Sequence, residues 1–166
     1  AYEPGNRVRS YLERSRNVNQ CENLEISHLA LSSESGNGWL RESWSDELRS
    51  IVSGTETGSD AQYIETSTLD AEAELHAWTG IDFVKIDAEG MEDRIIAGGQ
   101  QFFRDHSPLV MYEINNGGVH NLSLRWIFEV LGYQAFRLNG DGRFLSPVGD
   151  EQPDRYMINM FAVKPC

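Results

Sequence analysis

The sequence predicts an α/β domain built on a mainly parallel sheet. Apolar runs of strand length alternate with segments of helical spacing, which is typical of strands joined by helical crossovers. Residues 81–92 form the clearest unit, because an apolar run ends in acids and is followed by Gly90 and then by helical spacing. The length of 166 residues suits one domain, residues 1–166, with its own core.

In the first half of the chain, Val8, Tyr11 and Leu12 recur at helical spacing and predict a short helix over residues 6–16, with Asn6 as its N-cap. The patterns then predict a strand, a turn and a second short strand, at residues 24–31, 33–38 and 39–44. The small polar run at 53–60 predicts a loop, either a lid over a site or a surface insertion. A loose strand pattern from Tyr63 follows it.

In the second half, Thr68 is the predicted N-cap of a helix, and Gly98 and Gly132 are predicted helix ends. Helices are expected at residues 69–78, 91–97, 100–105 and 122–131. Strands are expected at residues 81–86, 109–114, 134–138 and 156–163, with a hairpin turn at 139–142 and a loop at 143–155.

Charge and composition exclude several classes of function. The formal net charge of −12 comes from scattered acids, so the surface repels phosphate backbones and nucleic acid is not an expected partner. No apolar run approaches the ~20 residues of a membrane helix, so a membrane is not an expected partner either. Cys21 and Cys166 lie far apart, which favours free thiols and a cytoplasmic location over a disulfide. His28 falls inside a predicted strand, which favours a structural role.

Acidic residues follow both of the central apolar runs. Asp87 and Glu89 come directly after the run at 81–86, and Glu113 ends the run that begins at Leu109. Ligands of open α/β sheets bind beyond the carboxyl ends of the strands, so these acids are candidate catalytic residues. His120, in the loop that follows, is a further candidate base because its intrinsic pKa is near neutral.

The run VKIDAEGMEDRIIAGG, followed by PLVMYEI, resembles the signature of FkbM-type methyltransferases. The resemblance extends over nearly the whole chain through AYEP at the start, ALSSESG and STLD further on, and INMFAVKP at the end. It implies a Rossmann-like class I methyltransferase sheet whose last strand is antiparallel between two parallel strands. It also implies S-adenosyl-L-methionine as methyl donor.

The same resemblance assigns residues to the donor. Glu3, followed by Pro4, would end the second strand of that sheet and accept hydrogen bonds from the ribose hydroxyls. Ala30 and Leu31 would lie against the adenine ring. Asp87 would contact the methionine portion or the transfer site.

The chain departs from the family pattern at its start. The family's first strand and glycine-rich loop would precede Tyr2, and that strand is central in the sheet. Without it we expect two half-sheets with bare edges, and we interpret the chain as a fragment or a domain cut from a longer protein.

The leading hypothesis is O-methylation of a hydroxyl group on a small molecule or sugar. A non-catalytic Rossmann-like binding module is the alternative from another class, and an amine or carboxylate acceptor is a third. A magnesium or calcium site is another interpretation of the acids, although their spacing matches no dedicated metal loop. Its ligands would be Asp87, Glu89, Glu92 and Glu113.

Overall fold

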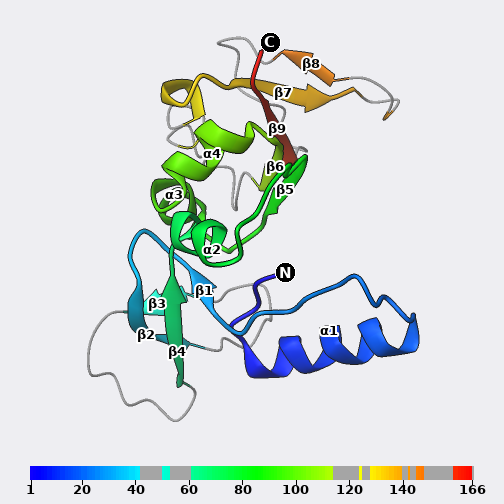
Figure 1. Cartoon of the computed structure of the whole chain (residues 1–166), viewed down its shortest axis with the longest axis vertical. Coiled ribbons are helices and arrows are strands. Elements are labelled where there is room, and N and C mark those ends of the chain that lie inside the picture. Colours follow the sequence, from blue (N-terminus) through cyan, green and yellow to red (C-terminus); the bar gives the residue numbers. More distant parts are fainter. Residues whose placement is uncertain are drawn as a thin grey trace.

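The protein has a mixed α/β fold whose strands form two separate sheets (Figure 1). The computed structural model describes residues 1–41, 50–52, 61–113, 124, 128–139, 142, 145–147 and 159–165. The predicted loop at 53–60, His120 and Cys166 lie outside the described residues. Among the helices described, none is both long and apolar enough to cross a lipid bilayer.

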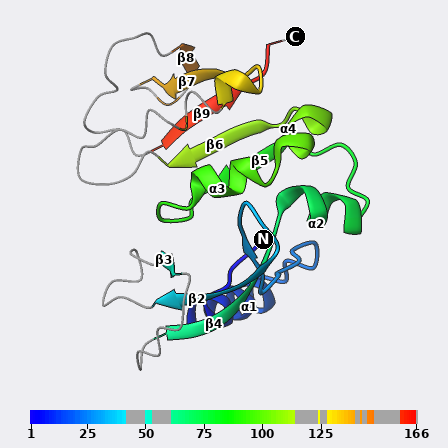
Figure 2. The same cartoon turned by 90° about the vertical axis from the view of Figure 1, so that its left-hand side faces the viewer.

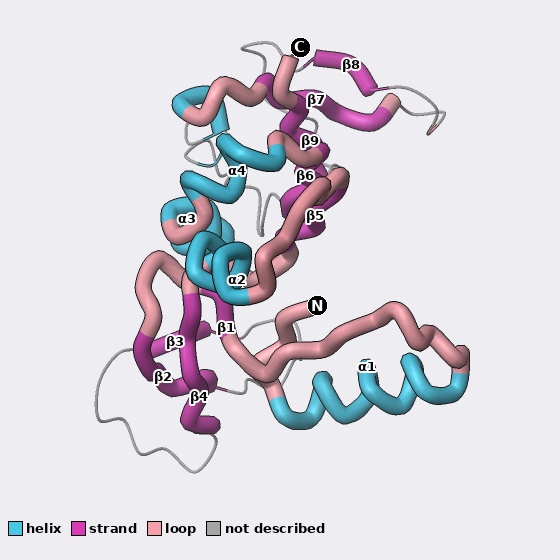
Figure 3. Tube along the Cα trace, in the orientation of Figure 1, coloured by secondary structure: helices cyan, strands magenta, loops and turns pink. Residues whose placement is uncertain are grey.

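The first sheet has the strand order β1-β4-β2-β3. Its strands are β1 (Ala30–Leu31), β2 (Gly36–Arg41), β3 (Ser50–Val52) and β4 (Ala61–Ser67). β1 pairs with β4 in parallel, whereas β2 pairs with both β4 and β3 in antiparallel register. Helix α1 (Asn6–Val18) precedes this sheet, and Figure 3 shows that loop makes up most of the segment between α1 and β1.

The second sheet has the strand order β5-β6-β9-β7-β8. Its strands are β5 (Phe83–Ile86), β6 (Leu109–Glu113), β7 (Gln134–Leu138), β8 (Leu145–Pro147) and β9 (Asn159–Val163). β5 and β6 are parallel, and β9 lies antiparallel between β6 and β7. The predicted place and direction of the last strand are therefore confirmed.

Three short helices lie between the first sheet and the far strands of the second: α2 (Leu69–Leu75), α3 (Glu92–Ala97) and α4 (Gln100–His106) (Figure 2). Thr68 caps α2 as predicted, because its Oγ1 accepts a hydrogen bond from the Ala71 N–H at 3.1 Å. The N-terminus of α4 is capped by a residue of α2, because the Asp70 carboxylate accepts hydrogen bonds from the Gln101 and Phe102 N–H groups.

The main core lies between these helices and the second sheet. Phe103 and Phe128 meet edge to face at 5.9 Å, and Tyr133 packs against both. Ile96, Val110 and other fully buried side chains complete this cluster. Phe102 and Phe103 are both buried. A much smaller cluster of Ala30, Leu40 and Ile64 serves the first sheet.

The expectation of one mainly parallel sheet is only partly met. Among the described strands, β1·β4 and β5·β6 are parallel, and an isolated parallel bridge joins Tyr2 to Ser27. The other pairings among the described strands are antiparallel: β2 with β3 and β4, β7 with β8, and β9 with β6 and β7. β1 and β5 each lie at the edge of a sheet, so the two sheets do not join within the described residues.

Several local predictions are corrected. The N-cap of α1 is Gly5 and not Asn6, and α1 continues to Val18. The strand expected at 24–31 is reduced to Ala30–Leu31, because only these residues and Ser27 find a parallel partner. The turn expected at 33–38 and the loop expected at 143–155 contain parts of β2 and β8, where antiparallel pairing stabilises sequences of weak strand propensity.

Candidate functional site

The turn after β5 carries the acids that the sequence singles out. β5 ends at Ile86, and the chain then turns through Glu89 at φ 50° and Gly90 at φ 91°. Both values lie in the left-handed region, which glycine adopts without strain and glutamate rarely adopts. The predicted sharp turn at Gly90 is therefore confirmed, and Glu89 is held in a strained conformation of the kind that clusters at functional sites.

Glu92 stabilises this turn from inside the protein. It is the first residue of α3, its side chain is 1% exposed, and its Oε1 accepts a hydrogen bond from the Ala88 N–H at 2.9 Å. A buried carboxylate that satisfies a backbone donor fixes the loop that carries it. Glu92 is therefore a structural support of the acidic turn rather than a solvent-facing neighbour of it.

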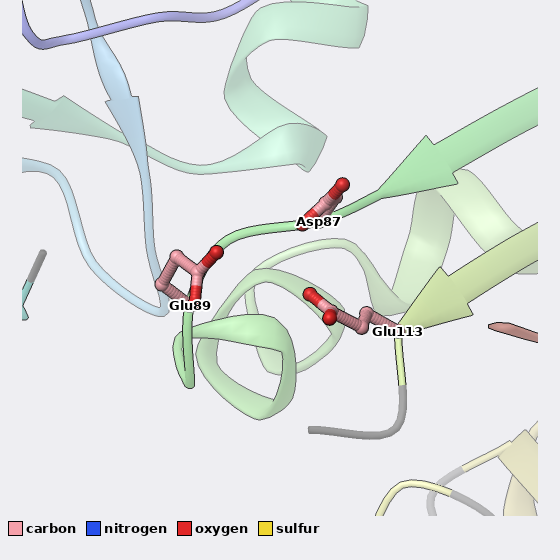
Figure 4. A group of neighbouring side chains, drawn as sticks. All are labelled: Asp87, Glu89 and Glu113. Carbon is pink, nitrogen blue, oxygen red and sulfur yellow. The ribbon is translucent and has the colours of Figure 1, made fainter. Parts of the chain in front are cut away.

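Asp87, Glu89 and Glu113 come together at one sheet edge (Figure 4). Asp87 follows β5 and Glu113 ends β6, one residue beyond the paired Ile86 and Tyr112. Each of the three carboxylates has an oxygen within 4.8 Å of those of the other two. The structure thus brings together the three acids that follow the two central strands in the sequence, and their catalytic role stays a prediction.

The two strand-end acids differ in protonation. A hydrogen bond from Lys85 lowers the pKa of Asp87 below its ordinary value, and a hydrogen bond from Glu113 acts in the same direction. Burial raises the pKa of Glu113 to about 7, and the hydrogen bond to Asp87 and the charges of the nearby acids add to the rise. Near neutral pH, Glu113 is therefore the member of the pair that takes up and releases a proton, whereas Asp87 stays ionised.

These carboxylates also offer oxygen ligands of the kind that magnesium and calcium prefer. Acidic groups often gather at a surface without an ion, and proton sharing between Asp87 and Glu113 already accounts for their approach. The metal interpretation stays a prediction.

A cavity of about 690 Å³ lies between the two sheets, beside β5. Ligand pockets commonly have volumes of about 300–1,000 Å³. Carboxylates line part of it, and apolar side chains such as Trp78, Ile81 and Phe102 line the rest. All five residues predicted to contact the donor line this one cavity: Glu3, Pro4, Ala30, Leu31 and Asp87.

Glu3 lines the cavity and directly follows a short parallel bridge at the start of the chain. Its N–H donates to the Ser27 carbonyl at 3.0 Å, next to the Tyr2–Ser27 bridge. The Glu3 Oε1 accepts a hydrogen bond from the Gly5 N–H at 2.7 Å. This local bond fixes the carboxylate beside the Tyr2–Ser27 bridge, at the position where the family resemblance predicts an acid that meets the ribose.

Of the two histidines considered in the sequence, the structure describes His28 but not His120. His28 is exposed, lies 3.7 Å from the Glu65 carboxylate and does not line the cavity. His120 lies outside the described residues, so its role as a base stays a prediction.

Sequence reasoning missed a close contact at Gly98. A β-carbon at this position would lie 2.1 Å from the Ser32 carbonyl oxygen, so only glycine fits. Ser32 directly follows Ala30 and Leu31, and the contact therefore fixes this wall of the cavity against α3. The Gly98-Gly99 pair was the available signal, because paired glycines mark close backbone approach as well as helix ends.

Comparison with known proteins now adds to this geometry. The methyltransferase FkbM domain family matches residues 1–135. The chain belongs to the FkbM methyltransferase domain family. No curated protein matches it. The methyltransferase FkbM from Methylobacillus flagellatus KT has a similar fold, with a TM-score of 0.57 at 15% sequence identity.

The match to that structure covers 97% of this chain and 35% of the other. The present chain therefore spans about a third of the length of this solved relative. At 15% identity this similarity concerns the fold alone, whereas family membership rests on the match over residues 1–135.

Proposed function

We propose that the full-length protein is an S-adenosyl-L-methionine-dependent methyltransferase that methylates a hydroxyl group of a small molecule or sugar. One observation carries the proposal: Glu3, beside the Tyr2–Ser27 bridge, and Asp87, directly after β5, line the same cavity. In an FkbM domain the first would accept hydrogen bonds from the ribose hydroxyls, and the second would face the methionine portion.

The chemistry of the cavity suits this donor. When bound, S-adenosylmethionine supplies a methyl group on a positively charged sulfonium. Asp87 and Glu89 would offset that charge. Pro4, Ala30 and Leu31 would provide apolar and backbone contacts for the adenine ring.

A hydroxyl acceptor must lose a proton as the methyl group arrives, so a general base aids the reaction. We assign this role to Glu113, which is not itself among the lining residues but is hydrogen-bonded to Asp87, which lines the cavity. A base whose pKa lies near the working pH transfers protons most effectively. Asp87, held ionised by Lys85, would orient the Glu113 carboxyl group.

The test is incubation of the full-length protein with methyl-labelled S-adenosylmethionine and a panel of hydroxyl, amine and carboxylate acceptors. Label on oxygen that depends on Glu113 supports the proposal. Label on nitrogen or on a carboxylate would contradict methylation of a hydroxyl group and identify an amine or carboxylate as the acceptor. Donor binding without transfer to any acceptor would favour a non-catalytic binding module.

A further inference from the structure

Glu72 is a buried acid that no proposed catalytic step uses. It lies in α2, its side chain is 4% exposed, and both of its oxygens accept hydrogen bonds from hydroxyl groups. Oε1 accepts from the Ser67 hydroxyl at 2.7 Å, and Oε2 accepts from the Tyr2 hydroxyl at 2.8 Å. His76 Nε2 lies 3.5 Å from Oε2.

These contacts join parts of the chain that are far apart in sequence. Tyr2 belongs to the segment that bridges Ser27, whereas Ser67 ends β4 and Glu72 lies in the helix that follows. The Tyr2 ring also packs edge to face against Trp78, at 6.3 Å between centroids. Burial and the bond to Glu72 raise the pKa of Tyr2, which keeps its hydroxyl protonated as a donor.

Glu3 directly follows Tyr2. The short segment that carries both is not a full strand. Main-chain hydrogen bonds with Ser27 hold it, and the Tyr2 side chain adds a further contact at Glu72. A hydrogen bond to a buried carboxylate is strong and directional, and it fixes the Tyr2 ring more firmly than packing alone.

We propose that Glu72 is a positioning residue, which through the Tyr2 hydroxyl holds the Glu3 carboxylate at the place where it meets the ribose of the methyl donor. The proposal rests on the proposed function, because it gives Glu3 its ligand. The hydroxyl of Ser67 bonds the same carboxylate but lies outside the cavity lining, so its bond contributes to stability and not to donor binding.

The test compares two variants of the full-length protein that each remove one hydroxyl bond to Glu72. Tyr2→Phe keeps the ring and loses one bond, and Ser67→Ala loses the other. The affinity for S-adenosylhomocysteine is measured by calorimetry, and stability by urea unfolding. We expect similar losses of stability, together with a roughly tenfold weaker affinity in Tyr2→Phe alone, since about 1.4 kcal/mol corresponds to a factor of ten.

Amide hydrogen exchange gives a readout that needs no ligand. Tyr2→Phe should accelerate exchange of the Glu3 and Gly5 amides, which bond to Ser27 and to the Glu3 carboxylate, whereas Ser67→Ala should leave them protected. Equal affinities and equal protection in the two variants would overturn the positioning role. An unmodified protein that binds no S-adenosylhomocysteine would instead overturn the proposed function.

Discussion

Asp87 and Glu113 extend two neighbouring parallel strands by one residue beyond the Ile86–Tyr112 pair, and their pKa values are displaced in opposite directions. Two carboxyl groups so placed share one proton, so each sets the protonation of the other. The pair titrates as a unit, and its behaviour yields the first prediction.

The rate of methyl transfer should rise as pH increases through about 7. The active base is the deprotonated Glu113 carboxylate, and its pKa is raised to about 7, so the base form is scarce below this pH and predominates above it. Glu113→Gln should lower kcat by roughly 10²–10⁴-fold and abolish this pH dependence. The exposed Glu74→Gln is the control. A pH profile that survives in Glu113→Gln would assign the base to another residue.

Removing the Lys85 charge should raise the pKa of Asp87. Lys85 provides the largest effect that lowers this pKa, so in Lys85→Met the carboxylate should take up a proton at higher pH than in the unmodified protein. Carbon NMR of the labelled Asp87 carboxyl group measures this directly. Lys164→Met, which removes a cation that contacts Arg104 and Tyr133, should leave the titration unchanged. Identical Asp87 titrations in both variants would contradict the assignment.

Gly98→Ala should destabilise the fold by about 1–3 kcal/mol, the usual range for overpacking. The new β-carbon would meet the Ser32 carbonyl at 2.1 Å, and a backbone atom cannot move aside as a flexible side chain does. Urea unfolding measures the loss. Gly36→Ala is the matched control, because its nearest neighbour would lie at 3.8 Å. Equal stability of the two variants would show that the Ser32 contact is unimportant.

Glu92→Ala should destabilise the protein by about 1–3 kcal/mol and weaken donor binding, because it leaves the Ala88 N–H without its acceptor. Glu92→Gln should lose less, since the amide oxygen still accepts that bond. Thermal unfolding and calorimetry of both variants provide the comparison. If both substitutions were equally harmful, the negative charge of Glu92, and not its hydrogen bond, would be what matters.

The strand, turn and helix around the acidic turn could be predicted because their signals are local. Apolar periodicity, Gly90 and the caps at Thr68 and Gly98 lie within a few residues of the structure they determine. The place of β9 followed instead from the family resemblance, since residue pattern does not specify strand order.

Features that depend on distant partners were not predictable in the same way. Burial of Glu72 requires the hydroxyl groups of Tyr2 and Ser67, and no spacing in the sequence brings these together. The strand character of Gly36 likewise depends on its pairing with Thr66 in β4. Local strand propensity is weak at such positions, and pairing with a strand distant in sequence determines whether they form a strand.

The most direct test of the proposed donor site is calorimetric titration of S-adenosylhomocysteine into the full-length protein and into Glu3→Ala and Asp87→Ala. We predict micromolar binding that each substitution weakens by about 1–3 kcal/mol, the range for hydrogen bonds to charged groups. Glu65→Ala, an exposed acid outside the cavity lining, should bind as the unmodified protein does. Absence of binding to the folded, unmodified protein, or affinities that neither substitution alters, would contradict a methyl-donor site between these two strand ends.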